Sequence, residues 1–212
     1  MAKRAAPEVN AGSMADIAFL LLIFFLVTTD IAVDSGLNRK LPPKQEDLKE
    51  KPPIIKERNI FQLSVNKNNE LFLKTGGEER TIKLTDLRKE AVAFLDNGGG
   101  IDKDACKFCR GSKNSKSSDN FQKAIISLQN DRLTKYSTYI AVQNEILAAY
   151  NELRNREFKR MYPNLGINYV QANAAYNDPQ TEPEDKEKLK EKLQEIKDMI
   201  PQKFSEAEPK KN

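Results

Sequence analysis

A nearly uncharged stretch of 21 residues near the N-terminus constrains this chain more than any other feature. It runs from Val9 to Thr29, and its one charged residue is Asp16. A helix of about this length spans the ~30 Å apolar core of a bilayer at ~1.5 Å per residue. The sequence therefore predicts a single transmembrane helix over residues 9–33.

Asp16 lies inside this span and not at its end. Asp30 follows it by 14 residues, which is roughly 21 Å along a helix, so the two carboxylates cannot lie at opposite membrane surfaces. Burying a carboxylate in hydrocarbon costs roughly 2.5–3.5 kcal/mol, and such a residue is a functional-site candidate. Because a low dielectric disfavours the anion, a carboxyl there can bind and release protons. We therefore expect Asp16 to be the proton-binding residue of an ion-coupled machine.

Small and apolar residues share the Asp16 face of the predicted helix. Leu20 and Ile23 follow Asp16 at helical spacing, and Gly12 and Ser13 precede it by one turn. Small residues allow close helix packing in lipid. Because one helix cannot enclose a proton path, partner helices must cover this face.

Two other interpretations of the N-terminal run stay open. A cleaved signal peptide has basic residues, here Lys3 and Arg4, before an apolar stretch of 7–15 residues, which Ile17–Val27 matches. A buried helix of a soluble protein is the other alternative. If the run is a membrane span, basic residues precede it and acidic residues follow it closely. Because basic flanking residues stay on the cytoplasmic side of a membrane, we expect residues 1–8 to lie in the cytoplasm.

The same residues resemble the start of ExbD/TolR proteins. The signature of this family is an Ile/Val-Asn pair with an Asp six residues after the Asn, and then a helix rich in Leu, Ile and Phe. Val9-Asn10 and Asp16 match it, whereas Gly12-Ser13 stand where family members commonly carry Thr-Pro. The resemblance implies a proton-channel subunit of an ExbB–ExbD type motor, with Asp16 as its proton-binding group.

The resemblance also implies a location and partners. The chain would cross the bacterial inner membrane once and use the proton motive force to energise TonB-dependent transport across the outer membrane. Its partners would be an ExbB-like multi-span membrane protein, a second copy in a homodimer and a TonB-like periplasmic protein. Two alternatives stay open: a TolR-like subunit of a cell-envelope integrity system, and a periplasmic interaction domain on an inert single-pass anchor.

Composition argues against several other function classes. The 212 residues include no His, which removes Ser-His-Asp and Cys-His catalysis and ordinary zinc hydrolase sites. The glycines Gly98–Gly100 are not followed by the Gly-Lys-Ser/Thr sequence of a phosphate-binding loop. The 35 basic and 31 acidic residues are mixed along the chain and form no basic cluster of the kind that binds nucleic acid. We therefore expect no enzyme, no cofactor, no metal site and no nucleic-acid partner.

Beyond the predicted span the chain is polar, with a mean hydropathy of −0.66 overall. We expect a Pro-rich periplasmic linker over 34–58, because Pro42-Pro43 and Pro52-Pro53 favour extended backbone. The linker is a plain spacer, or its segment Leu37–Pro42 adds a strand to a sheet edge as in the family it resembles. A small periplasmic domain over 59–170 and a C-terminal extension over 171–212 follow.

Hydrophobic patterns predict an α+β fold for this domain, with helices packed on one face of a sheet. A helix capped by Thr85 ends at the glycines after Asn97, and a long helix with an apolar stripe from Tyr139 to Leu153 ends before Pro163. The predicted strands are Ile60–Val65, Glu70–Lys74, Thr81–Leu84, Phe121–Leu128 and Ile167–Val170.

Residues 98–120 look like an insertion in the domain and contain the two cysteines of the chain, Cys106 and Cys109. A periplasmic location favours a disulfide between them. A redox-active pair, a four-cysteine zinc site shared by two chains and free thiols are the alternatives.

The extension contains one amphipathic helix. Thr181 and Glu184 have capping-box spacing, Leu189, Leu193, Ile196 and Ile200 form a narrow apolar seam, and Pro201 ends the pattern. This helix packs on its own domain, or it pairs with a second copy or a partner.

Overall fold

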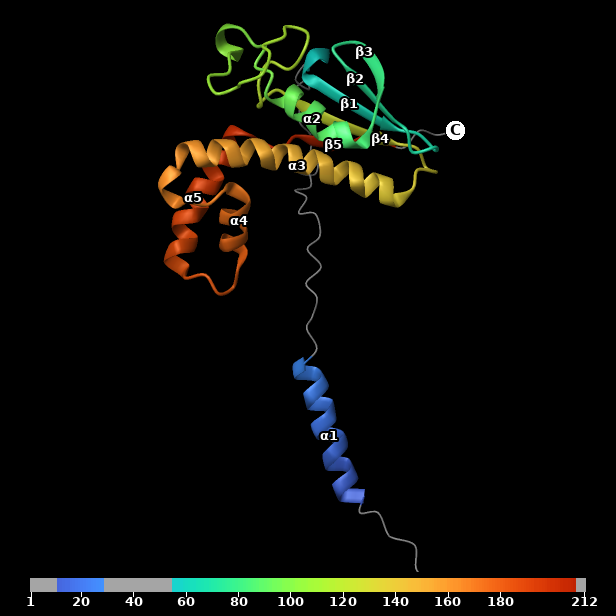
Figure 1. Ribbon diagram of the computed structural model, residues 1–212, viewed down its shortest axis with the longest axis vertical. Helices are drawn as coiled ribbons and strands as arrows, with labels where there is room; N and C mark the ends of the chain where they lie inside the picture. Colours follow the sequence, from blue (N-terminus) through green and yellow to red (C-terminus); the bar gives the residue numbers. More distant parts are fainter. Residues whose placement is uncertain (1–10, 29–54, 209–212) are drawn as a thin grey trace, which may run out of the picture. The chain divides into compact units, whose positions relative to one another are not determined.

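The computed structural model describes residues 11–28 and 55–208, which belong to two units, residues 1–51 and 52–212. The first unit contains one described helix, α1 (Ala11–Thr28), shown in blue in Figure 1. It lies within the predicted span, and residues 9–10 and 29–33 of that prediction are outside the described residues. None of the helices in the described ranges is long and apolar enough to cross a membrane.

The second unit is built on a mixed sheet with the strand order β3-β2-β1-β4-β5. The β2 strand pairs antiparallel with β1 and with β3, whereas β4 runs parallel to β1 and to β5. The strands are β1 (Ile60–Val65), β2 (Leu71–Thr75), β3 (Glu78–Ile82), β4 (Ile125–Asn130) and β5 (Phe204–Glu206).

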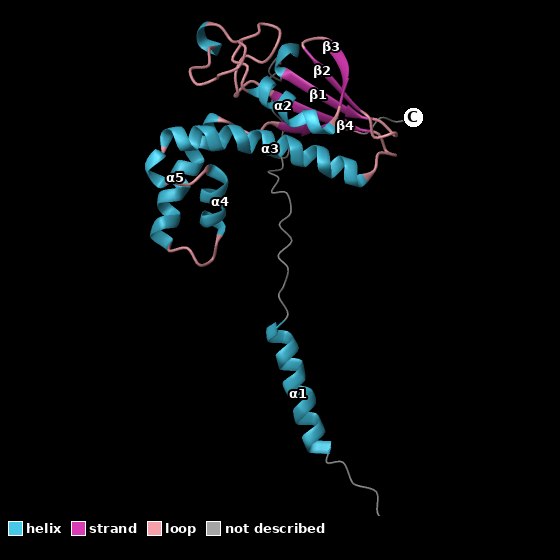
Figure 2. Cartoon of the chain, viewed as in Figure 1, coloured by secondary structure: helices cyan, strands magenta, loops and turns pink. Residues whose placement is uncertain are grey.

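The helices complete an α+β fold, as the sequence predicts (Figure 2). The α-helices are α2 (Leu84–Leu95), α3 (Tyr136–Met161), α4 (Tyr169–Asn177) and α5 (Pro183–Met199). Three short 3₁₀ turns are η1 (Glu57–Asn59), η2 (Asp102–Asp104) and η3 (Pro163–Leu165).

Helices α2 and α3 cover one face of the sheet. Alternate residues of the strands point into this layer, such as Leu63 of β1 and Leu128 of β4, and both are fully buried. They share one core with Leu87 of α2 and Ile146 of α3. The period of two in the strands and of 3.6 in the helices therefore brings the apolar sides of both layers together.

A second, smaller core joins α4 and α5 to the C-terminal part of α3. It contains Phe158 of α3, Tyr169 of α4 and the buried face of α5 at Leu193 and Ile196. Packing of the predicted amphipathic helix on its own domain is therefore confirmed. After α5, the chain returns to the sheet and forms β5 beside β4.

One predicted strand is wrong in kind. Ile167 and Asn168 lie in a loop, and α4 begins at Tyr169. Asn168 accepts a hydrogen bond from the Gln171 backbone at 2.9 Å and Gln171 accepts one from the Asn168 backbone at 2.9 Å, so this pair closes a capping box. The local capping signal therefore outweighs the short apolar run.

Other predicted elements are present with shifted boundaries. The strand predicted at Thr81–Leu84 is β3, which ends at Ile82, and the N-cap of α2 is Lys83 and not Thr85. Phe121 lies in a turn, and β4 begins only at Ile125. In α5 the N-cap is Glu182, with no side-chain cap bond, so Thr181 does not cap the helix. These differences are confined to element ends, where local signals compete.

Candidate functional site

The first candidate site is the Asp16 face of α1. Asp16 lies in the second turn of the described helix and is its one charged residue. Gly12 lies one turn before it, and Leu20 and Ile23 lie on the same side at the i+4 and i+7 positions. Ser13 belongs to the same helix. The five residues predicted for the proton site therefore lie in one element.

The large apolar side chains of α1 are exposed. The large ones between Met14 and Val27 are 42–77% exposed. Helices that are apolar on all sides are found in the cores of large proteins or in membranes. The helix therefore presents a nearly continuous apolar surface.

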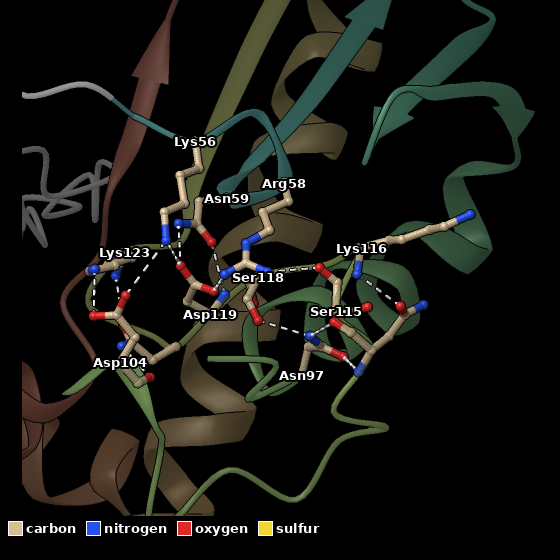
Figure 3. A network of polar contacts seen from close by, with 12 residues as sticks. Lys56, Arg58, Asn59, Asn97, Asp104, Ser115, Lys116, Ser118, Asp119 and Lys123 are labelled. Carbon is tan, nitrogen blue, oxygen red and sulfur yellow. Dashed lines mark hydrogen bonds and ion pairs between the residues drawn. The ribbon is translucent and has the colours of Figure 1, made fainter. Parts of the chain in front are cut away.

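The second candidate site lies where the chain enters the sheet. Because β1 and β4 are parallel neighbours, with Ile60 opposite Ile125, the segments that precede them meet at the same edge of the sheet. Figure 3 shows the polar side chains of these segments converging on Asp119.

Asp119 is the centre of this network and has no exposed surface. Arg58 forms an ion pair with its carboxylate, and Asn59 Nδ2 donates a hydrogen bond to Asp119 Oδ2 at 3.0 Å. In return, the backbone N–H of Asp119 donates to Asn59 Oδ1 at 2.8 Å. Lys56 Nζ lies 3.6 Å from Asp119 Oδ2. The segment before β1 is thus joined to the end of the 98–120 loop.

A second carboxylate, Asp104, extends the network. Lys123 Nζ donates to Asp104 Oδ1 at 2.5 Å, and Lys56 Nζ lies 3.7 Å from Asp104 Oδ2. The hydrogen bond from Lys123 lowers the pKa of Asp104, with partial burial acting in the opposite direction. Three cations and two carboxylates are therefore gathered at this edge of the sheet.

The loop itself is held by Asn97, which follows α2. Its amide Nδ2 donates to the backbone oxygens of Asn114 at 2.9 Å and of Ser118 at 2.8 Å. Its Oδ1 accepts from the backbone of Asn114 at 2.9 Å and from Ser112 Oγ at 3.1 Å. One buried amide therefore fixes both limbs of the loop, as Figure 3 shows in part.

The role that this network can perform is structural, because it fastens the 98–120 loop to the segment before β1. Its carboxylates are engaged by cations and amides, and it presents no nucleophile next to a base. Within residues 11–28 and 55–208, no group of three or more His, Cys, Asp or Glu side chains is arranged to hold a metal ion.

Cys106 and Cys109 form a disulfide in the same loop. The backbone N–H of Cys109 also donates to Cys106 Sγ at 3.1 Å, and the Phe108 ring stacks on Phe121 with centroids 5.4 Å apart. The two cysteines and the Asp16 face belong to different units of the structure.

The sequence interpretation missed the Asp119 network. Its members lie just before β1 and just before β4, and Asn59 and Asp119 are 60 residues apart. In the sequence, the members of the network are visible only as a cluster of polar residues before each of two apolar strands. This pattern predicts contact between the two clusters only when the strands are known to be parallel neighbours.

Comparison with known proteins gives one family. The model of the family described as "Biopolymer transport protein ExbD/TolR" matches residues 2–154, more than half of the chain. The matched region includes α1, the first four strands and most of α3. No curated protein and no solved structure matches the chain.

Proposed function

The chain belongs to the ExbD/TolR family of biopolymer transport proteins, and we propose that it is the proton-binding subunit of an inner-membrane motor of the ExbB–ExbD type. In this proposal the stretch from Val9 to Thr29, which contains α1, crosses the inner membrane once, with residues 1–8 in the cytoplasm. The motor uses the proton motive force to energise TonB-dependent transport across the outer membrane. The protein carries out no enzymatic reaction of its own.

The position of Asp16 is the observation that carries this proposal. It is the one charge in a helix of apolar side chains, on a face that includes Gly12, Leu20 and Ile23. A carboxyl group inside a membrane span marks a functional site by default, and it is a group that can carry a proton. Asp16 can therefore load a proton on one side of the membrane and release it on the other.

The exposed apolar surface of α1 supports helical partners. Side chains that are 42–77% exposed along this helix need lipid and neighbouring helices around them. We propose that an ExbB-like multi-span protein encloses the helices of two copies of this chain. The Asp16 faces would lie against that enclosure, where small residues such as Gly12 leave room for water.

The disulfide supports a periplasmic location for residues 55–208. Disulfides persist in oxidising compartments, and the bacterial periplasm is one of them. Cys106 and Cys109 are paired, and the structure describes no free cysteine. We propose that this domain passes the work of the motor to a TonB-like periplasmic protein. Each elementary charge that crosses 100 mV supplies ~2.3 kcal/mol, so substantial mechanical work needs several protons.

Substitution of Asp16 tests the proposal directly. Asp16→Asn keeps the shape of the side chain but cannot titrate, so it should assemble with its partners and reduce energised transport to background. Asp16→Glu should retain part of the activity, because its carboxyl titrates but reaches farther. The measurement is complementation of a deletion strain, under conditions in which growth requires TonB-dependent uptake, at matched levels of membrane protein.

Asp30→Asn is the matched control, since it removes an identical charge at the end of the predicted span and should leave growth near the wild-type level. Wild-type growth of Asp16→Asn would show that the helix is an inert anchor. Copurification of an ExbB-like protein with both variants checks that assembly is intact. Loss of that partner in Asp16→Asn alone would assign Asp16 to assembly and remove its role in proton transfer.

A further inference from the structure

A small cavity lies between the disulfide loop and the last turn of α3. Its volume is about 180 Å³, and it is lined by Lys107, Phe108, Cys109, Arg110 and Arg160. Three of these five residues are cations and none is an acid. Pockets that hold drug-sized ligands have volumes of roughly 300–1,000 Å³, so this smaller cavity fits one small chemical group and not a large molecule.

The acidic residues beneath the cavity are already engaged. Asp96 is 6% exposed and accepts hydrogen bonds from both terminal nitrogens of Arg156, at 2.6 and 2.8 Å. Glu157 is fully buried and accepts from Arg156 Nε at 2.9 Å and from Arg160 Nε at 2.6 Å. Two cations thus balance these two carboxylates.

The charges of Lys107 and Arg110 are in excess of this balance. Within the described residues, neither side chain forms an ion pair or a side-chain hydrogen bond, and both are exposed at the rim of the cavity. Arg160 uses Nε for Glu157 and is about half exposed, so its terminal nitrogens are available for another acceptor. The cavity therefore presents positive charge that no carboxylate in its lining neutralises.

The backbone that presents these charges is held rigidly. The Cys106–Cys109 disulfide closes the loop, and the stacked ring of Phe108 fixes its centre. On the C-terminal side, the backbone N–H of Arg110 donates to Asp96 Oδ1 at 3.0 Å, and that of Gly111 donates to the Asp96 backbone oxygen at 2.9 Å. Because this backbone is already ordered, a ligand pays little entropy for ordering the loop.

We propose that this cavity binds the phosphate group of a phosphate monoester. A phosphate monoester carries about −1.5 to −2 charges at neutral pH and three strong acceptor oxygens, which suits an excess of cations better than a single carboxylate does. The planar forks of Arg110 and Arg160 match phosphate oxygens, and Lys107 supplies a third, point-like charge. The site is separate from the proposed proton site, and its test does not depend on motor function.

The test uses the full chain in a maltoside detergent, at low ionic strength and in a buffer without phosphate. Inorganic phosphate is titrated by calorimetry, and the backbone amides of Arg110 and Gly111 are followed by NMR. We expect saturable binding with shifts at both amides. Lys107→Gln and Arg110→Gln should each weaken binding by about tenfold or more, the effect of losing one charge-assisted contact.

Lys116→Gln is the matched control, because it removes the same charge from an exposed position of the same loop outside the cavity lining. It should change the affinity by less than about twofold, and all three variants should unfold at the same temperature as the wild type. Absence of saturable binding would overturn the proposal. An equal loss of affinity in Lys116→Gln and Arg110→Gln would overturn it as well, since that pattern indicates general attraction to a basic surface.

Two monoester probes then distinguish the source of the phosphate group. Glycerol phosphate represents a soluble ester, and a short-chain phosphatidic acid below its micellar concentration represents a lipid headgroup. Equal affinity for both assigns the site to a soluble phosphate ester. Tighter binding of the lipid probe, abolished by Arg110→Gln, assigns it to a phosphorylated lipid.

Discussion

Asp119 and Tyr150 are both completely buried, yet their neighbours make them sensitive to different changes. The Asp119 carboxylate forms an ion pair with the Arg58 guanidinium through Oδ1 and accepts a hydrogen bond from the Asn59 amide at Oδ2. Tyr150 is enclosed by the core, and its hydroxyl donates one long hydrogen bond of 3.4 Å to the Lys203 backbone oxygen. Removing the charge of Asp119 and ionising Tyr150 are therefore the two single-residue changes that we expect to disturb this domain most clearly.

Asp119→Asn should destabilise the domain by about 2–4 kcal/mol. The substitution preserves volume but leaves the Arg58 guanidinium without its counter-charge, and Arg58 Nε is already buried without an acceptor. The expected loss is smaller than for a fully buried ion pair, because Arg58 keeps 27% of its side-chain surface exposed to solvent. Urea unfolding of the full chain in detergent gives the free energy of unfolding.

Glu145→Gln is the comparison for this measurement. It removes the partner of Arg88 in an ion pair whose side chains are 49% and 27% exposed, and should cost at most about 1 kcal/mol. Equal effects of the two substitutions would contradict the view that the Asp119 network clamps the loop to the sheet.

Stability should fall at alkaline pH, with Tyr150 as one cause. Burial raises the pKa of Tyr150 above its ordinary value of 10.0, and the hydrogen bond to the Lys203 backbone oxygen and the charge of Arg154 oppose this rise only in part. As the pH rises past 10, the tyrosine ionises in the unfolded chain but stays neutral in the folded one, so unfolding becomes more favourable. Tyr150→Phe should reduce the slope of unfolding free energy above pH 10 by about 1.4 kcal/mol per pH unit.

Tyr136→Phe is the control for the alkaline limb, because Tyr136 is 75% exposed, and it should leave the slope as in the wild type. Chemical denaturation between pH 8 and pH 11.5 gives both slopes. A Tyr150→Phe slope that equals the wild-type slope would assign the alkaline loss to other groups.

Among the secondary-structure elements, α5 shows that a narrow stripe of apolar residues is enough to pack a helix on its domain. Its buried residues are Leu189, Leu193 and Ile196, spaced at four and three residues, and the other faces are charged. The seam packs on Phe158 and Tyr169, which lie on α3 and α4. Arg154 of α3 strengthens the junction by donating two hydrogen bonds to the Ile200 backbone oxygen, at 3.1 and 2.9 Å. The helix is therefore an integral part of the folded unit.

Leu193→Ala should destabilise the domain by about 2–4 kcal/mol, because it opens a cavity in the second core where Leu193 is only 2% exposed. Glu191→Ala, two residues earlier on the exposed face, should change stability by less than about 0.5 kcal/mol. Thermal unfolding followed by circular dichroism compares the two variants. A small effect of Leu193→Ala would indicate that α5 packs loosely and is held mainly through β5.

For the folded unit as a whole, the C-terminal residues are structural. The family match ends at residue 154, within α3, but the chain beyond it forms α4, α5 and β5. Ile200 is buried in the main core, and β5 pairs with Ile126–Leu128 of β4. Residues 155–208 therefore complete both cores and cover one edge of the sheet.

A chain that ends after Gln180 should fail to fold cooperatively. It lacks α5, Ile200 and β5, which uncovers Phe158 and leaves β4 without one partner strand. A typical domain is held together by only ~5–15 kcal/mol, so it does not tolerate the loss of parts of both cores. A chain that ends after Glu208 retains every described element and should unfold within about 2 °C of the wild type. Native-state proteolysis and thermal unfolding compare the two truncations. A Gln180 truncation with an unchanged melting temperature would show that the residues after Gln180 are not needed for folding.

Local patterns in the sequence were sufficient for several elements. The β1–β2 hairpin, the long helix α3, the seam of α5 and the apolar helix that carries Asp16 all follow from periodicities and turn residues within a few positions of one another. The Cys106–Cys109 pair was also within reach, since two cysteines three residues apart can meet in one turn. The proton-site prediction stands on this same local footing.

Tertiary structure decided the rest, because it depends on residues far apart in the chain. The parallel alignment of β1, β4 and β5 brings Arg58 to Asp119 and returns residues 204–206 to the sheet edge. The basic cavity beside the disulfide loop likewise needs Arg160 of α3 beside Arg110 of the loop, 50 residues earlier. The sequence determines the chemistry of each side chain. Strand order and helix packing determine which charged side chains meet in one buried site. Strand order and helix packing are in turn fixed only when the apolar surfaces of all elements are buried together.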